Sequence, residues 1–179
     1  MDAARPHPEL EMTLASAWSS LAGERCAFTS LDVMPDIQPG DACFRLPVLR
    51  PDGLEAGRVL LVLGDEDSHQ LGASMFGLPL DELGPSELDD ATAELCNIFG
   101  SCLVKALDAH PQLELGLPRR ASIGAVEALC SLSMPQLMLA ATMGPQRVVV
   151  AYFDRECGAE HLDEPQAFPP SKEPRHGRP

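Results

Sequence analysis

The spacing of apolar residues along the chain predicts three helices. Apolar side chains recur every three or four residues over residues 8–22, 65–77 and 86–109, which is the spacing of one face of a helix. Asp65 is the expected N-cap of the second helix and Ser86 that of the third. The apolar stripe of the third helix comprises Leu88, Ala91, Leu95, Phe99, Cys102, Leu103 and Ala106.

Shorter apolar runs bounded by turn residues predict the strands. The first pair flanks PDGLEAG, a turn-rich linker, so these two strands are expected to be neighbours. The second strand of that pair contains VLLVL, a continuous apolar run typical of a central strand. The last two strands form a hairpin across a Gly144-Pro145 turn. The predicted strands are residues 28–34, 41–49, 58–63, 113–117, 136–143 and 147–153.

These elements predict a single α/β domain of the α+β kind over residues 1–155. We expect one largely antiparallel sheet with the two long helices packed on one face. Residues 156–179 are rich in proline and charge and nearly devoid of core residues. They are predicted to be a disordered tail, because nothing offsets the entropy of ordering them.

Composition narrows the range of partners. The 179 residues carry a formal charge of −14 and a pI near 4.6, which argues against nucleic acid and anionic membrane surfaces. No apolar run approaches the roughly 18–20 residues that span a bilayer. The N-terminal MDAARPHPELEM lacks the pattern of a signal peptide, so we expect a cytoplasmic protein.

No metal site is expected from the cysteines and histidines. The six cysteines form no CxxC pair and are predicted to be reduced thiols, mostly small buried side chains. The five histidines form no HxxxH or HExxH motif. The acidic run GDEDSHQ is interpreted as the N-terminus of a helix, where acidic residues are favourable.

A polar stripe runs along the third helix, opposite its apolar face. Glu94 and Asn97 are neighbours on adjacent turns, so their side chains can act on one object. Gly100 lies next to them and is expected to let something approach the helix backbone closely. From spacing alone, an ordinary solvated surface is the favoured explanation of the stripe. The stripe comprises Asp90, Glu94, Asn97, Ser101, Lys105 and Asp108.

The stretch DDATAELCNIFGSCLVKAL resembles the CheC/CheX family of chemotaxis phosphatases. It is preceded, as in that family, by a VLLVL strand, a GASMFG helix end and a polar linker. The family helix carries Asp or Ser, three residues, Glu, two residues and then Asn, and this pattern falls on Asp90, Glu94 and Asn97. Pro118 is close to the position of a proline that usually follows in the family. The resemblance covers residues 10–154.

The sequence departs from the family pattern at two places. Ser101 stands where family members commonly have glycine, and Gly100 comes one residue earlier. An Arg119-Arg120 pair follows Pro118, which is not expected in the family. Only one helix carries the Glu-x-x-Asn pair, which is similar to the single-site CheX branch.

The resemblance implies a phosphatase that hydrolyses the aspartyl-phosphate of a CheY-type response regulator. Asn97 would orient the attacking water and Glu94 would pair with the regulator's active-site lysine, with Asp90 and Ser101 as further binding residues. The protein would need no cofactor of its own, because the partner receiver supplies Mg²⁺. An uncharged amide suits this role, since it fixes a water without adding negative charge beside a phosphoryl group.

Two alternatives remain open from the sequence. One is a non-catalytic module of the same fold that binds a receiver domain or a flagellar switch protein. The other is a structural domain whose polar stripe is solvated surface.

The resemblance to CheX also implies a homodimer. The hairpin strand RVVVAYF is long and apolar and is expected to lie at a sheet edge, where it could pair with a second copy.

Overall fold

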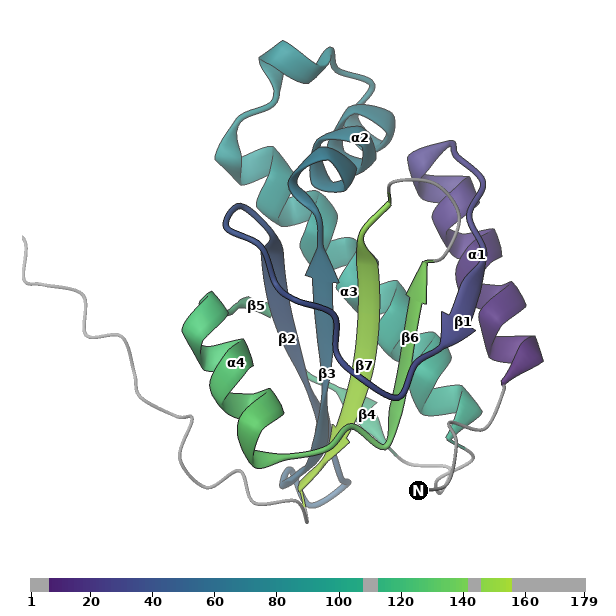
Figure 1. Cartoon of the computed structure of the whole chain (residues 1–179), viewed down its shortest axis with the longest axis vertical. Helices are drawn as coiled ribbons and strands as arrows, with labels where there is room; N and C mark the ends of the chain where they lie inside the picture. Colours follow the sequence, from purple (N-terminus) through teal and green to yellow (C-terminus); the bar gives the residue numbers. More distant parts are fainter. Residues whose placement is uncertain (1–6, 108–112, 142–145, 156–179) are drawn as a thin grey trace, which may run out of the picture.

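A seven-stranded sheet forms the centre of the protein (Figure 1). The computed structural model describes residues 7–107, 113–141 and 146–155. The strand order is β1-β6-β7-β3-β2-β4, with β5 also paired to β2, and all pairings are antiparallel. The predicted antiparallel sheet is therefore confirmed. The strands are β1 (Phe28–Ser30), β2 (Ala42–Leu49), β3 (Glu55–Leu63), β4 (Glu114–Leu115), β5 (Arg119–Arg120), β6 (Leu137–Ala141) and β7 (Val148–Asp154).

The strands at the middle of the sheet are buried on both faces. In β3 every residue from Val59 to Leu63 is buried, as the run VLLVL predicted for a central strand. Alternate residues along a strand point to opposite faces, so they belong to two separate cores. Leu61 contributes to one core and Leu60 to the other.

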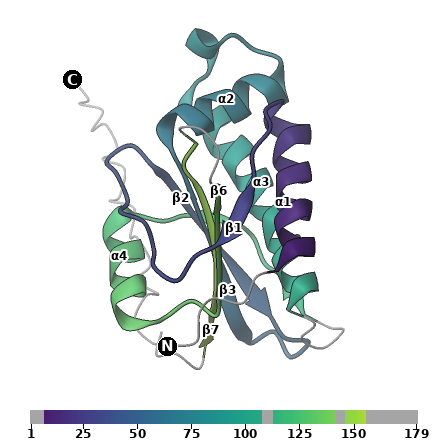
Figure 2. The same ribbon diagram turned by 45° about the vertical axis from the view of Figure 1, so that its right-hand side comes forward.

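Helices cover both faces of this sheet (Figure 2). On one face lie α1 (Pro8–Ala22), α2 (Asp65–Phe76) and α3 (Pro85–Ala106), and the larger core fills the space between them and the sheet. On the other face lies α4 (Ile123–Leu132) over the smaller core. Leu31, Met34 and Ile37, from the segment between β1 and β2, pack on the smaller core as well. A short 3-10 turn, η1 (Leu80–Glu82), separates α2 from α3.

The three predicted helices are present, and the placement of two long helices on one face is confirmed. The predicted caps are wrong, because Gly64 precedes α2 and Gly84 precedes α3 in the N-cap positions. The sequence prediction contained no helix at α4. This helix is short, with ten residues, and buries only Val126 and Leu129, so its periodicity is weak.

The predicted edge position of RVVVAYF is wrong. The strand β7 lies between β3 and β6 and pairs with both along most of its length. It therefore has no free edge to offer to a second copy. The argument from this strand for a homodimer fails, and the homodimer stays a prediction that rests on the resemblance.

Some predictions concern residues outside the described ranges. These are the Gly144-Pro145 turn, Asp108 at the end of the polar stripe, and the tail over residues 156–179. Among the described cysteines, all five are free thiols, as predicted. None of the helices in the described ranges is both long and apolar enough to cross a membrane.

Candidate functional site

The candidate site lies on α3, a helix of 22 residues that is firmly held against the sheet. Pro85 occupies the first turn, and Lys105 in the last turn complements the negative end of the helix dipole. The inward face buries Leu95, Phe99 and Leu103 completely. Phe99 also makes an edge-to-face contact with Phe28 of β1, with ring centroids 5.5 Å apart. This packing fixes which residues of α3 face outward.

The predicted polar stripe faces away from the core. Asp90 and Glu94 are exposed, and Asn97 and Ser101 are half-buried. Glu94 and Asn97 are separated by one turn, which places their Cβ atoms about 5–6 Å apart. Within the described part of the chain, the side chains of these four residues make no hydrogen bond or ion pair. The carboxylate of Glu94 and the amide of Asn97 are therefore available to an external molecule.

Gly100 does not belong to this outward face. It is buried where α3 crosses β2, and an added Cβ would lie 2.5 Å from Cδ2 of Leu46. The close approach that the sequence predicted is made by the protein's own sheet. The expectation that Gly100 opens the stripe to an outside molecule is therefore wrong, and the reason for the glycine is packing.

No known family model and no curated protein matches this sequence. Solved structures do match its fold. CheX from Vibrio vulnificus aligns with a TM-score of 0.57 and 10% identity, over 82% of this chain and 96% of that chain. A CheX–CheY–BeF3–Mg²⁺ complex from Borrelia burgdorferi aligns with a TM-score of 0.53 and 14% identity, over 82% and 95% of the two chains.

The chain has a CheX/CheC-like fold. The same fold extends to FliM from H. pylori in its complex with SpeE, which aligns with a TM-score of 0.58 and 11% identity over 87% of each chain. These identities are low, so the likeness concerns the fold. The CheX/CheC-like fold thus includes proteins solved with different partners.

The Arg119-Arg120 pair splits between the two faces of the CheX/CheC-like sheet. In β5, Arg120 lies opposite Phe44 and Arg119 lies opposite Arg45. Arg120 is on the α3 side, where its guanidinium donates to Oδ1 of Asp89 in an ion pair. The positive charge of Arg120 therefore lies beside Asp89 of α3, and Asp89 immediately precedes Asp90 of the polar stripe. Successive residues of a strand point to opposite faces, so this split follows once the two residues are known to form a strand. The sequence did not indicate a strand here.

A separate acidic cleft lies at the start of α2, away from the stripe. It has a volume of about 810 Å³, and its acidic lining residues are Glu24, Asp41, Asp65, Glu66 and Asp67. The lining includes neither Glu94 nor Asn97. Among the described residues, no group of three or more acidic, histidine or cysteine side chains is placed to hold a metal ion.

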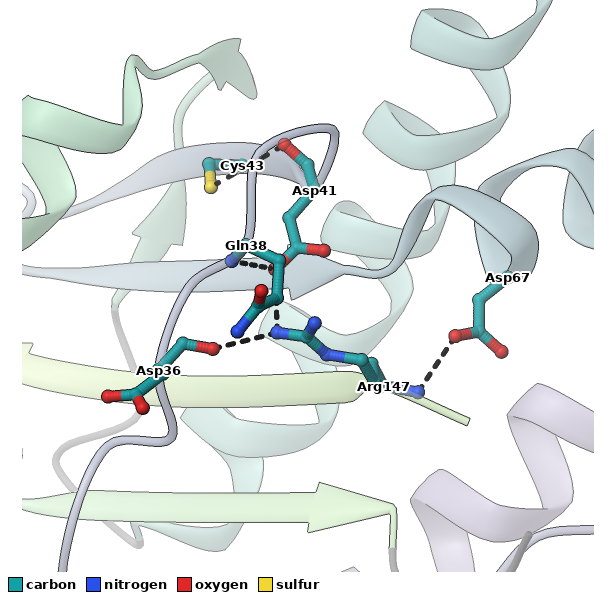
Figure 3. A network of polar contacts seen from close by, with 6 residues as sticks. All are labelled: Asp36, Gln38, Asp41, Cys43, Asp67 and Arg147. Atoms are coloured by element: carbon teal, nitrogen blue, oxygen red, sulfur yellow. Dashed lines mark hydrogen bonds and ion pairs between the residues drawn. The ribbon is translucent and has the colours of Figure 1, made fainter. Parts of the chain in front are cut away.

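Arg147 connects three segments at this cleft (Figure 3). Its Nη2 donates to the carbonyl oxygen of Asp36 at 2.7 Å and to Oδ2 of Asp41 at 2.9 Å. Its backbone N–H donates to Oδ2 of Asp67 at 2.7 Å. Gln38 N–H also donates to Oδ2 of Asp41, at 2.8 Å. These contacts tie the start of β7 to α2 and to the segment before β2.

Asp67 has an unusual environment for a carboxylate. Burial raises the pKa of the Asp67 carboxyl, and the negative charges of Glu24 and Glu66 raise it further. The hydrogen bond from the Arg147 N–H opposes this rise. The acidic run at residues 64–70 is accordingly a helix N-terminus, as predicted, with one of its carboxylates turned inward to hold β7.

Proposed function

We propose that this chain is a CheX-like phosphatase that hydrolyses the aspartyl-phosphate of a CheY-type response regulator. The observation that carries the proposal is the outward placement of Glu94 and Asn97 on one long helix of a CheX/CheC-like fold. Both side chains are free of partners within the described ranges, as residues that contact another protein need to be. A relative of this fold solved as a complex of CheX with CheY, BeF3 and Mg²⁺ supports the class of partner.

Each residue of the stripe has a chemical role in this proposal. Asn97 enters the active site of the receiver, where its amide accepts from and donates to the attacking water. Glu94 pairs with a lysine of the receiver and holds the two proteins in register. Asp90 and Ser101, one turn to either side, extend the contact along the helix. Phosphoryl transfer requires mainly positioning and neutralisation of charge, so these residues need no covalent step.

The metal in this reaction belongs to the partner. Mg²⁺ bound to the receiver neutralises charge on the phosphoryl group. This chain supplies an uncharged amide and a carboxylate directed at a lysine, and neither of them has to bind the metal.

A second candidate is a binding module of the same fold without hydrolysis. The match to FliM in a complex with SpeE favours it, because that protein of the same fold was solved with a different partner. In this case the stripe on α3 would dock a receiver or a flagellar switch protein. Gly100 does not favour either candidate, since its contact with Leu46 accounts for its position.

The deciding experiment follows the phosphate on a CheY-type receiver. The receiver is phosphorylated with a small-molecule donor, the donor is removed, and loss of the aspartyl-phosphate is timed with and without this protein. Faster loss supports the phosphatase. Binding to the receiver without faster loss supports the module, and absence of both leaves the stripe as solvated surface.

We infer a cytoplasmic location, and a homodimer completes the proposal because the CheX branch implies one. Light scattering at micromolar concentration tests the dimer, for which the mass should be twice the 19.2 kDa of one chain. A mass of one chain would contradict it.

A further inference from the structure

Charged residues lie on both sides of Asn97 along the outward face of α3, and their signs differ. Asp90 and Glu94 precede Asn97, and Lys105 follows it. All three charged residues are exposed, whereas Asn97 and Ser101 between them are half-buried. The stripe therefore runs from negative, through uncharged, to positive in the direction of the helix.

The geometry of the helix places Lys105 in line with Glu94. Lys105 follows Glu94 by eleven positions, which is about three turns, so the two side chains leave α3 in nearly the same direction. At 1.5 Å per residue, Lys105 lies about 16 Å from Glu94 and about 12 Å from Asn97 along the helix axis. An interface of standard size covers about 800 Å² on each partner, so one docked domain can reach both ends of the stripe.

The ammonium of Lys105 is not committed elsewhere in the described part of the chain. No hydrogen bond or ion pair joins it to another described residue. The other cation beside α3, Arg120, is already paired with Asp89. Lys105 also complements the helix dipole, but a cation at any position around the last turn satisfies that role. The dipole therefore does not account for the alignment of Lys105 with Glu94.

We propose that Lys105 contacts an acidic side chain of the receiver and fixes the direction in which the receiver lies along α3. This inference rests on the proposed function and adds a second charged anchor to the one at Glu94. With a lysine of the receiver at Glu94 and a carboxylate at Lys105, both ends of the stripe are paired. Rotating the receiver by half a turn about Asn97 would place like charges opposite each other at both ends, which is unfavourable.

Lys105 is a specificity-determining residue in this arrangement and takes no part in the chemical step. It lies about 12 Å along the axis from Asn97, which is too far to touch the reacting atoms. The docking face of the partner carries a basic group near its phosphorylated aspartate and an acidic group beyond it, on the side of Lys105. A receiver without that acidic group should bind more weakly and, once docked, lose its phosphate at the same rate.

The first test measures the affinity of the full chain for a CheY-type receiver loaded with BeF3 and Mg²⁺ in place of the labile phosphoryl group. Lys105→Gln should weaken binding about threefold to fivefold at low salt, and Lys105→Glu about tenfold or more. Both losses should shrink at about 0.5 M salt, because screening removes the attraction. The matched control is Arg119→Gln, which removes the same charge from an exposed residue on the other face of the sheet and should change the affinity by less than about 1.5-fold. Hydrolysis at saturating Lys105→Gln should match the wild type.

The second test is coupling with a carbodiimide, which joins an amine directly to a carboxylate. Lys105 is the only lysine before Lys172, so a cross-link from its Nζ is readily assigned by mass spectrometry. We expect an amide between Lys105 and an aspartate or glutamate of the receiver, and its loss in Lys105→Gln.

Two results would overturn the inference and leave the proposed function intact, provided that the wild type speeds the loss of receiver phosphate. One is equal affinity for the receiver in Lys105→Gln and Arg119→Gln. The other is coupling of Glu94 to a lysine of the receiver while Lys105 couples to none of its carboxylates. A wild-type protein that neither binds the receiver nor speeds the loss of its phosphate would remove the inference and the proposed function together.

Discussion

Gly100 of α3 and Leu46 of β2 meet where the helix crosses the sheet, and there is no room for a side chain between them. A Cβ on Gly100 would lie 2.5 Å from Cδ2 of Leu46, which is completely buried and cannot move away freely. The same helix carries Asn97 one turn before Gly100 and the exposed Glu94 one turn before Asn97. The distance between α3 and the sheet, and with it the position of the candidate site, thus depends on a residue without a side chain.

Gly100→Ala should destabilise the protein. Overpacking of a core costs about 1–3 kcal/mol, and the better helix propensity of alanine returns about 1 kcal/mol. A net loss of up to about 2 kcal/mol is expected in thermal or urea unfolding. The matched control is Gly124→Ala in α4, where a Cβ would meet nothing within 4 Å. That variant should be as stable as the wild type or slightly more so, and an equally stable Gly100→Ala would mean that α3 can shift away from β2.

Asp67→Asn should stabilise the protein at neutral pH and not at acidic pH. Burial raises the pKa of Asp67, so the folded protein holds this proton more tightly than the unfolded chain. As the pH rises above the ordinary aspartate pKa of about 3.9, the unfolded chain ionises first and the wild type loses stability. Asparagine avoids this loss and can still accept the Arg147 N–H.

The check on Asp67 is the free energy of unfolding of both proteins from acidic to neutral pH. The advantage of Asp67→Asn should be absent at acidic pH, where Asp67 is protonated in both states, grow as the pH rises from the ordinary aspartate pKa to the raised one, and level off above it. If the free energies of unfolding of the two proteins differ by the same amount at every pH, the effect comes from packing and not from ionisation of Asp67.

Removal of residues 156–179 should leave stability unchanged. Every residue of the two cores lies before Arg155, whose Nη1 donates to the carbonyl oxygen of Glu55 at 3.3 Å. The removed segment has too few apolar residues to offset the entropy of ordering it. The full and shortened chains should therefore melt within a degree or so of each other, and a much lower midpoint for the shortened chain would show that the segment packs on the domain.

The elements with a strong period were predictable from the sequence. The helix α3 has a long apolar stripe and a polar stripe opposite, so the outward placement of Glu94 and Asn97 followed from spacing. The helix α4 was missed because it has ten residues and two buried positions. One signal could have revealed it: Ser122 caps it and accepts the Ala125 N–H at 3.2 Å, at the start of an apolar run.

Two wrong predictions, the edge position of β7 and the role of Gly100, have different causes. The run VVVAYF is apolar at every position, like the correctly placed VLLVL, and this pattern is typical of a central strand. The edge was predicted because the run lies near the end of the domain, but the last strand along the chain lies in the middle of the sheet. The partner of Gly100 could not be predicted, because it depends on where α3 crosses β2 in three dimensions.

Asn97→Ala should abolish phosphatase activity and leave the fold intact. The amide makes no hydrogen bond within the described ranges, and alanine is the better helix former, so the melting temperature should stay equal or rise. Loss of the group that positions the water should slow hydrolysis of the receiver phosphate by about 100-fold or more. The control is Glu127→Ala, an exposed residue of α4 on the other face of the sheet, which should keep full activity. Near wild-type turnover in Asn97→Ala would contradict the mechanism.

Glu94→Ala should act mainly on binding to the receiver. A charge-assisted hydrogen bond to a lysine is worth about 1.5–3 kcal/mol, so the affinity for the receiver should fall by about 10-fold to 100-fold. Glu94→Gln keeps an acceptor without the charge and should lie between the alanine variant and the wild type. At saturating concentrations of the alanine variant, the rate of hydrolysis should recover most of the way, because Asn97 is still present to orient the water. Unchanged affinity would remove Glu94 from the interface, and a rate that stays low at saturation would move it from docking to the chemical step.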